Sequence, residues 1–167
     1  IGGAGSYYDP SSLARNNILV TPGENFYYTD AISDTAVAFI KDHSEEKPFF
    51  MYVAYTAPHW PLHAKPSDIN KYKGKYDNGW DKIREQRLQN AKEKGVISRD
   101  LALTPRDAGI PAWGDAPNKE WETSKMEVYA AMVDCMDQGI GRIISTLKEK
   151  GEFENTLIFY LQDNGGC

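Results

Sequence analysis

The segment FFMYVAYTAPHWPLH, residues 49–63, gives the clearest indication of the fold class. Its first half, residues 49–55, is an apolar run of the length and composition typical of a buried strand. Prolines stand on both sides of His59 directly after that run, so the backbone that presents this histidine is stiff. Because ligands of an α/β sheet bind outside the carboxyl ends of its strands, the pattern indicates a functional histidine. The alternative, a histidine hydrogen-bonded beneath a loop, stays open; His43 and His63 are interpreted as solvated and loop residues.

A helix is predicted on the N-terminal side of this strand. Residues 1–28 are rich in Gly, Tyr, Asn and Pro, and we interpret them as loop. Apolar residues then recur at helical spacing from Thr29 onward, which predicts a helix that ends in the polar turn of residues 44–48. A helix followed by a strand after a short turn is typical of α/β folds.

The same order recurs near the C-terminus. Apolar residues at steps of three and four predict a long helix over residues 126–147, with Gly151 as its C-terminal cap. Gly139 and Gly141 within it lower helix propensity, which suggests close packing or a kink. A second buried strand is predicted over residues 156–161.

Between these units, residues 64–122 are predicted to be an irregular insert. Within the insert, residues 83–94 are polar and fit a solvated helix. An insert of this length is either functional or mobile. The aromatic side chains in or beside the insert either stack on the apolar faces of sugar rings or anchor the loops to the body of the protein; these are Trp60, Tyr72, Tyr76, Trp80 and Trp113.

Composition excludes several classes of function. The chain has 167 residues, which suits one domain or a piece of a larger one, and we interpret it as a fragment. Its net charge of -5 argues against a nucleic-acid surface. The sequence contains no apolar stretch of the ~20 residues that a membrane span needs. Two cysteines match neither a disulfide framework nor a zinc motif.

The second candidate site follows the second predicted strand. Asp163 and Asn164 offer two hard oxygen ligands, and the glycines after them allow the backbone to turn around an ion. Ca²⁺ takes about 6–8 oxygen ligands and Mg²⁺ about six, so further ligands would have to come from elsewhere. The other interpretation is an ordinary Asp-Asn-Gly turn.

Four segments, residues 26–31, 48–61, 126–144 and 155–166, resemble in this order the central part of the formylglycine-dependent, arylsulfatase-like sulfatases of the alkaline phosphatase superfamily. The resemblance implies an α/β fold: part of an alkaline-phosphatase-like sheet flanked by helices, incomplete as a fragment. It also implies that the whole chain is the central part of a sulfatase catalytic domain. The resemblance is weakest over residues 64–122, which are a candidate for a substrate-facing insert. The resemblance favours a periplasmic or secreted location, which the sequence itself leaves open.

The resemblance also implies a reaction and its site residues. In the family, a hydrated formylglycine attacks the sulfur of a sulfate ester, and Ca²⁺ neutralises charge on the sulfate and the nucleophile. His59 matches the sulfate-contacting histidine that stabilises or protonates the leaving side, and Trp60 beside it is a substrate-binding candidate. Asp163 and Asn164 match the metal-ligand pair. The expected partner is a sulfate ester, either a sulfated carbohydrate or an aryl sulfate, without nucleic acid or membrane.

Departures from the family pattern limit what this chain can do by itself. It contains no Cys-x-Pro-Ser-Arg motif or serine variant, so the formylglycine precursor is absent. Cys135 falls in the predicted helix and is interpreted as structural, and Cys167 also lies outside that pattern. We therefore expect the fragment alone to be inactive. A phosphodiesterase or phosphonate hydrolase of the same superfamily, and a non-catalytic binding module on the same scaffold, stay open.

Overall fold

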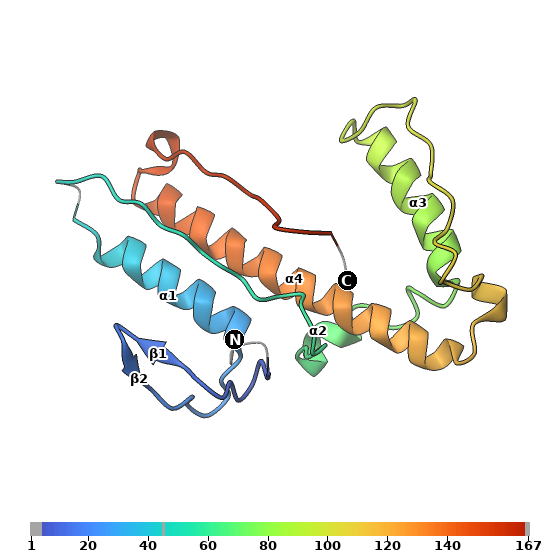
Figure 1. Cartoon of the computed structure of the whole chain (residues 1–167). Coiled ribbons are helices and arrows are strands. Elements are labelled where there is room, and N and C mark those ends of the chain that lie inside the picture. Colours follow the sequence, from blue (N-terminus) through green and yellow to red (C-terminus); the bar gives the residue numbers. More distant parts are fainter. Residues whose placement is uncertain (1–4, 45, 166–167) are drawn as a thin grey trace.

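The computed structural model describes residues 5–44 and 46–165 (Figure 1). Its elements are β1 (Ala14–Arg15), β2 (Ile18–Leu19), α1 (Tyr28–Asp42), α2 (Pro66–Asn70), α3 (Gly79–Glu93), η2 (Trp113–Asp115), α4 (Lys119–Glu149) and η3 (Phe153–Asn155). Within the described ranges, none of the helices combines the length and apolarity needed to cross a membrane. Glu45 of the predicted turn, Gly166 and Cys167 lie outside the described residues.

Helices α1 and α4 form the body of the structure and run side by side in the same direction (Figure 1). The buried positions of α1 recur at helical spacing, namely Thr29, Ser33, Ala36 and Ile40. At the far end of the pair, Lys150 donates from Nζ to the carbonyl oxygens of Ile40 and His43, at 3.0 and 2.7 Å. A cation beside these carbonyls stabilises the C-terminus of α1.

Both predicted helices are confirmed, with small differences in their bounds. Helix α1 starts one residue before the predicted Thr29. Helix α4 starts earlier than the predicted residue 126 because Asn118 caps it: the Asn118 side chain accepts a hydrogen bond from the Trp121 N–H at 3.1 Å. Gly151 has a φ of 74° and donates to the Lys148 carbonyl at 3.0 Å, which confirms it as the C-terminal cap.

The two glycines inside α4 differ in their surroundings. A Cβ on Gly139 would lie only 2.1 Å from Ser33 Oγ of α1, so the two helices approach too closely there for a side chain. Ser33 Oγ in turn donates to the Thr29 carbonyl at 3.0 Å and lies 2.8 Å from the Tyr55 hydroxyl. A Cβ on Gly141 would meet nothing within 4 Å. Close packing therefore explains Gly139 and not Gly141.

A small hydrophobic core lies where α4 meets the N-terminal segment and residues 56–64. Its buried members are Tyr7, Tyr27, Ala57, Ala64, Ala131, Met132, Cys135 and Met136. Cys135 is 2% exposed, in agreement with its structural interpretation. Burial and the neighbouring Asp30 carboxylate raise the pKa of its thiol to about 11.

The prediction of two buried strands is wrong for the described residues. Residues 49–55 and 156–161 are extended but pair with no strand in that part of the chain, where the sheet consists of β1 and β2 alone. Many of their large apolar side chains face solvent; Phe50 is 94% exposed and Leu161 83%. A strand takes its hydrogen bonds from a neighbouring strand, and its faces are buried only when a second layer covers them. The described residues supply neither for these two segments.

The hairpin β1–β2 was not predicted from the sequence. It is antiparallel, with Ala14 opposite Leu19 and Arg15 opposite Ile18. The two residues between the strands, Asn16 and Asn17, have φ values of 51° and 66°. Positive φ at both central positions is the requirement of a type I′ turn, and asparagine tolerates it better than most residues. The Asn-Asn pair was therefore the sequence signal from which the hairpin could have been predicted.

The insert of residues 64–122 contains more helix than predicted. Helix α3 confirms the predicted solvated helix and starts earlier, at Gly79. Gly79 has a φ of 72°, and a Cβ on it would lie 1.9 Å from the ring of Trp113. The Asp81 carboxylate accepts a hydrogen bond from the backbone N–H of Trp113 at 2.8 Å and forms an ion pair with Arg106 at 2.9 Å. The rings of Trp80 and Trp113 meet edge to face at 4.7 Å between centroids. These two tryptophans therefore anchor the loop after α3, as one of the two open interpretations proposed.

Candidate active site

His59 lies on a tight turn at the end of the extended segment 49–55. Its backbone N–H donates to the Thr56 carbonyl at 2.9 Å. The Ala57-Pro58 and Trp60-Pro61 peptide bonds on either side are both cis. The side chain of His59 is exposed, and its Nδ1 lies 2.6 Å from the carbonyl oxygen of Trp60. Because a carbonyl oxygen only accepts hydrogen bonds, Nδ1 carries a proton and Nε2 is left to interact with a ligand.

This arrangement defines what the imidazole can do. With Nδ1–H bonded to the Trp60 carbonyl, Nε2 of the neutral ring is an acceptor. In the protonated ring, Nε2–H becomes a donor that can bind an anion or protonate an oxygen that leaves. Trp60 is 50% exposed beside it and offers an apolar surface. The turn therefore presents a proton donor and an aromatic face to solvent.

Two buried tyrosines attach this turn to the core. The Tyr7 hydroxyl lies 2.8 Å from the Thr56 carbonyl oxygen and 3.0 Å from that of His59. The Tyr27 hydroxyl donates to the His63 carbonyl at 2.9 Å. Burial raises the pKa of both phenols, so they keep their donor protons at neutral pH. The sequence carries no local signal for these contacts, because Tyr7 precedes Thr56 by 49 positions.

Two cations, Lys65 after the turn and Arg142 of α4, are already paired with carboxylates. Lys65 Nζ lies 2.7 Å from Asp30 and 3.5 Å from Asp68. Burial opposes its charge, but the hydrogen bond to Asp30 and the nearby carboxylates outweigh this, and its pKa is raised. Arg142 of α4 lies 3.7 Å from Asp30 and 3.1 Å from Asp34. These charges join α1, α2 and α4 behind the turn instead of serving as an open anion site.

Asp163 and Asn164, the predicted metal ligands, lie on an exposed bend after residues 156–161. The Asn164 side-chain amide donates to the Gly165 carbonyl at 2.6 Å, so its oxygen is the atom left for a ligand. Two oxygens of this kind suit Ca²⁺ chemically but fall short of the about 6–8 ligands it takes. Among the residues that the structure describes, no group of three or more His, Cys, Asp or Glu side chains could hold a metal ion. The pair thus fits part of a calcium site.

The two candidate turns have equivalent positions in the architecture. Residues 49–55 and 156–161 each follow one of the two long helices, and they run in the same direction in Figure 1, away from the C-terminal ends of α1 and α4. His59 follows the first segment, and Asp163 and Asn164 follow the second. In the described residues no sheet joins the two segments, so the prediction that their carboxyl ends meet at one sheet edge stays a prediction.

The other aromatic candidates divide between packing and exposure. Tyr72 packs against the hydrophobic core, with Lys75 Nζ 4.8 Å from its ring centroid. Tyr76 is also a packing residue, since burial raises the pKa of its phenol. Trp60 therefore keeps its interpretation as a substrate-binding candidate, whereas Tyr72 joins Trp80 and Trp113 as a packing residue.

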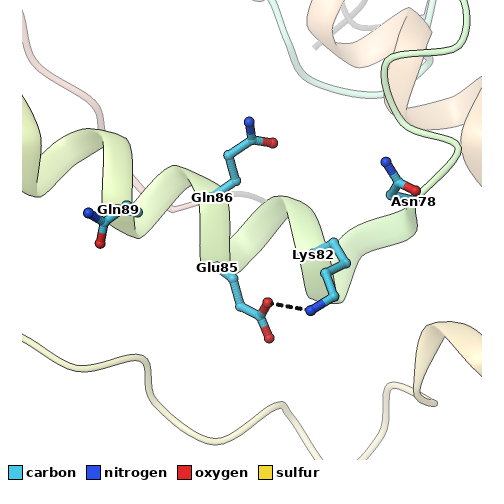
Figure 2. A pocket seen from close by; sticks show the side chains of 5 residues that line it. All are labelled: Asn78, Lys82, Glu85, Gln86 and Gln89. Carbon is cyan, nitrogen blue, oxygen red and sulfur yellow. Dashed lines mark hydrogen bonds and ion pairs between the residues drawn. The ribbon is translucent and has the colours of Figure 1, made fainter.

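A shallow hollow lies elsewhere and contains no predicted site residue. Figure 2 shows its five lining side chains, which come from α3 and from the residue before it: Asn78, Lys82, Glu85, Gln86 and Gln89. Its volume is about 670 Å³, and Lys82 pairs with Glu85 across one turn at 2.8 Å. A shallow, polar face made by a single helix lacks the enclosing walls of a typical ligand pocket. We interpret it as a solvated surface.

Comparison with known proteins identifies relatives. The chain is 39% identical over 145 residues to an uncharacterized sulfatase of Schizosaccharomyces pombe, covering 85% of this chain and 26% of that protein. It is 36% identical over 152 residues to an arylsulfatase of Klebsiella aerogenes, covering 90% and 33%. It is 29% identical over 167 residues to an N-acetylglucosamine-6-sulfatase of Bos taurus, covering 96% and 27%. The chain thus spans between about a quarter and a third of the length of these relatives.

The family model for sulfatases matches residues 3–166, and this span includes both candidate turns. The family implies an alkaline-phosphatase-like α/β fold, in which helices such as α1 and α4 accompany a sheet. The chain belongs to the sulfatase family.

Proposed function

We propose that this chain is the central part of the catalytic domain of a sulfuric ester hydrolase. The observation that carries the proposal is the match of the sulfatase family model to residues 3–166, with both candidate turns inside it. The relatives are named arylsulfatase and N-acetylglucosamine-6-sulfatase, which favours a sulfate ester of a phenol or a sugar as the substrate. The attacking group comes from outside residues 1–167, because this sequence lacks the Cys-x-Pro-Ser-Arg motif.

His59 is the group in this chain that we assign to the reacting ester. The Trp60 carbonyl holds Nδ1, so Nε2–H of the protonated ring is free to face the ester oxygen. When the sulfur–oxygen bond breaks, negative charge develops on the leaving oxygen, and a proton from Nε2 neutralises it. The exposed ring of Trp60 would contact the apolar part of the alcohol.

Asp163 and Asn164 are assigned to a metal ion. Their carboxylate and carboxamide oxygens would hold Ca²⁺ together with ligands from elsewhere in the full-length protein. When bound, the ion supplies positive charge that stabilises negative oxygens of the sulfate group. The exposed position of both residues agrees with ligands that are shared with other parts of the protein.

The test is hydrolysis of 4-nitrophenyl sulfate and 4-nitrophenyl phosphate by the purified full-length protein that contains this chain. We expect turnover of the sulfate ester and at most weak turnover of the phosphate. A preference for the phosphate would refute the proposed reaction.

The assignment of His59 is tested by His59→Asn, with His43→Asn as the matched control. His43 lies at the end of α1, and its Nε2 lies 2.6 Å from the Lys47 carbonyl oxygen. We expect His59→Asn to lower kcat about 100-fold, because a positioned proton donor contributes on that order. The His43 variant should keep wild-type kcat, and an equal loss in the two variants would remove His59 from the reaction.

A further inference from the structure

We propose that Tyr7 is a positioning residue that holds His59 in place for the reaction; this inference rests on the proposed function. Tyr7 is fully buried, and its hydroxyl lies 2.8 Å from the Thr56 carbonyl oxygen and 3.0 Å from the His59 carbonyl oxygen. These two carbonyls flank the turn that carries the histidine. One side chain therefore ties both ends of the His59 turn to the core.

The hydroxyl has one proton for two acceptors. A phenol donates a single hydrogen bond, so Tyr7 shares its proton between the two carbonyls in a three-centre bond. Since Ala57 inside the turn is buried against the same core, water has little access to replace a lost donor. The position of the turn thus depends on this one proton.

The rest of Tyr7 is fixed from both sides. Its carbonyl oxygen accepts from the Tyr28 N–H at 2.8 Å, at the first residue of α1. Its ring stacks on Tyr27 with 6.0 Å between centroids. Its backbone N–H lies 3.4 Å from His63 Nδ1, on the far side of the turn. A side chain held this rigidly transmits the position of α1 to the backbone of His59.

The test compares Tyr7→Phe with Tyr55→Phe in the full-length protein. Tyr55→Phe also removes one phenol hydroxyl, but that hydroxyl meets Ser33 Oγ of α1 and no atom of the turn. In Tyr7→Phe, we expect hydrogen exchange of a peptide covering residues 56–63 to accelerate about tenfold, because the carbonyl oxygens of Thr56 and His59 lose their donor and the turn opens more often. Tyr55→Phe should leave exchange in that peptide at the wild-type rate. Equal exchange in the wild type and Tyr7→Phe would overturn the proposal, whether or not the protein is a sulfatase.

A kinetic arm separates positioning from general loss of stability. With aryl sulfates whose phenols have increasing pKa, the wild type should show a shallow decline in kcat, since His59 protonates the leaving oxygen. Tyr7→Phe should steepen that decline, with about a tenfold loss for the poorest leaving group and little for 4-nitrophenol. A uniform loss across the series would overturn the positioning role and leave the sulfatase activity itself established.

A rescue variant covers the case in which Tyr7→Phe does not fold. Replacing Tyr7 with 4-aminophenylalanine keeps the ring and supplies two N–H donors, one for each of the two carbonyls. We expect this variant to show wild-type exchange of residues 56–63 and a wild-type dependence on the leaving group. Exchange about tenfold faster than wild type in this variant would contradict the assignment.

Discussion

Gly139 is a position in the helix pair where a single added methyl group should lower stability. The two helices α1 and α4 touch there, and a Cβ on Gly139 would lie 2.1 Å from Ser33 Oγ and 3.0 Å from Ser33 Cβ. Gly139→Ala gains about 1 kcal/mol in helix propensity. It costs roughly 1–3 kcal/mol in overpacking, and about 1 kcal/mol more because Ser33 Oγ has to move and give up its hydrogen bonds. We expect a net destabilisation of roughly 1–3 kcal/mol.

The matched control is two residues away. A Cβ on Gly141 meets nothing within 4 Å, so Gly141→Ala should raise stability by roughly 0.5–1 kcal/mol. Urea unfolding of the purified full-length protein, followed by circular dichroism, measures both variants against the wild type. The two substitutions should shift the midpoint in opposite directions without a change in slope. Adding Ser33→Ala to Gly139→Ala should recover part of the loss. Equal midpoints for the two single variants would refute the close helix contact.

Two further predictions concern alkaline pH and the loop after α3. Burial raises the pKa of the Cys135 thiol from 9.0 to about 11, so the unfolded chain releases a proton that the folded chain keeps, and stability should fall as pH rises from 9 toward 11. Urea midpoints across that range should fall less steeply in Cys135→Ala, and an unchanged slope would contradict the burial of the thiol. In Gly79→Ala, a Cβ would lie 1.9 Å from the Trp113 ring, whereas in Gly95→Ala only the positive φ of 68° is unfavourable. Proteolysis within residues 96–112 should therefore become much faster in the Gly79 variant alone.

Local periodicity was sufficient to predict the two long helices, α1 and α4, but not the short helix α2. The spacing of apolar residues in α1 and α4 reflects the faces that these helices bury against each other, so the pattern and the packing have the same cause. The apolar runs of residues 49–55 and 156–161 gave a correct prediction of extended backbone and a wrong prediction of burial. Burial of a strand depends on neighbours in other parts of a protein, and Phe50 has none among the described residues.

The candidate site shows the same limit. His59, Asp163 and Asn164 could be named from the sequence because each follows an apolar run at a turn. The residues that hold the His59 turn and its neighbours in place could not be named from the sequence. The hydrogen-bonded residues Tyr7 and Thr56 are 49 positions apart in the sequence, and Lys65 and Asp30 are 35 apart. Contacts of that kind are set by how the helices pack, and they leave no periodic trace in the sequence.

We expect the two turns, His59 and Asp163–Asn164, to belong to one site. The test is a crystal structure of the full-length protein soaked with Ca²⁺. The ion should be bound by oxygens of Asp163 and Asn164 at about 2.3–2.6 Å. His59 should lie at the same edge of one sheet, within about 10 Å of Asp163. An ion bound without these two residues, or His59 and Asp163 at opposite ends of the sheet, would contradict this expectation.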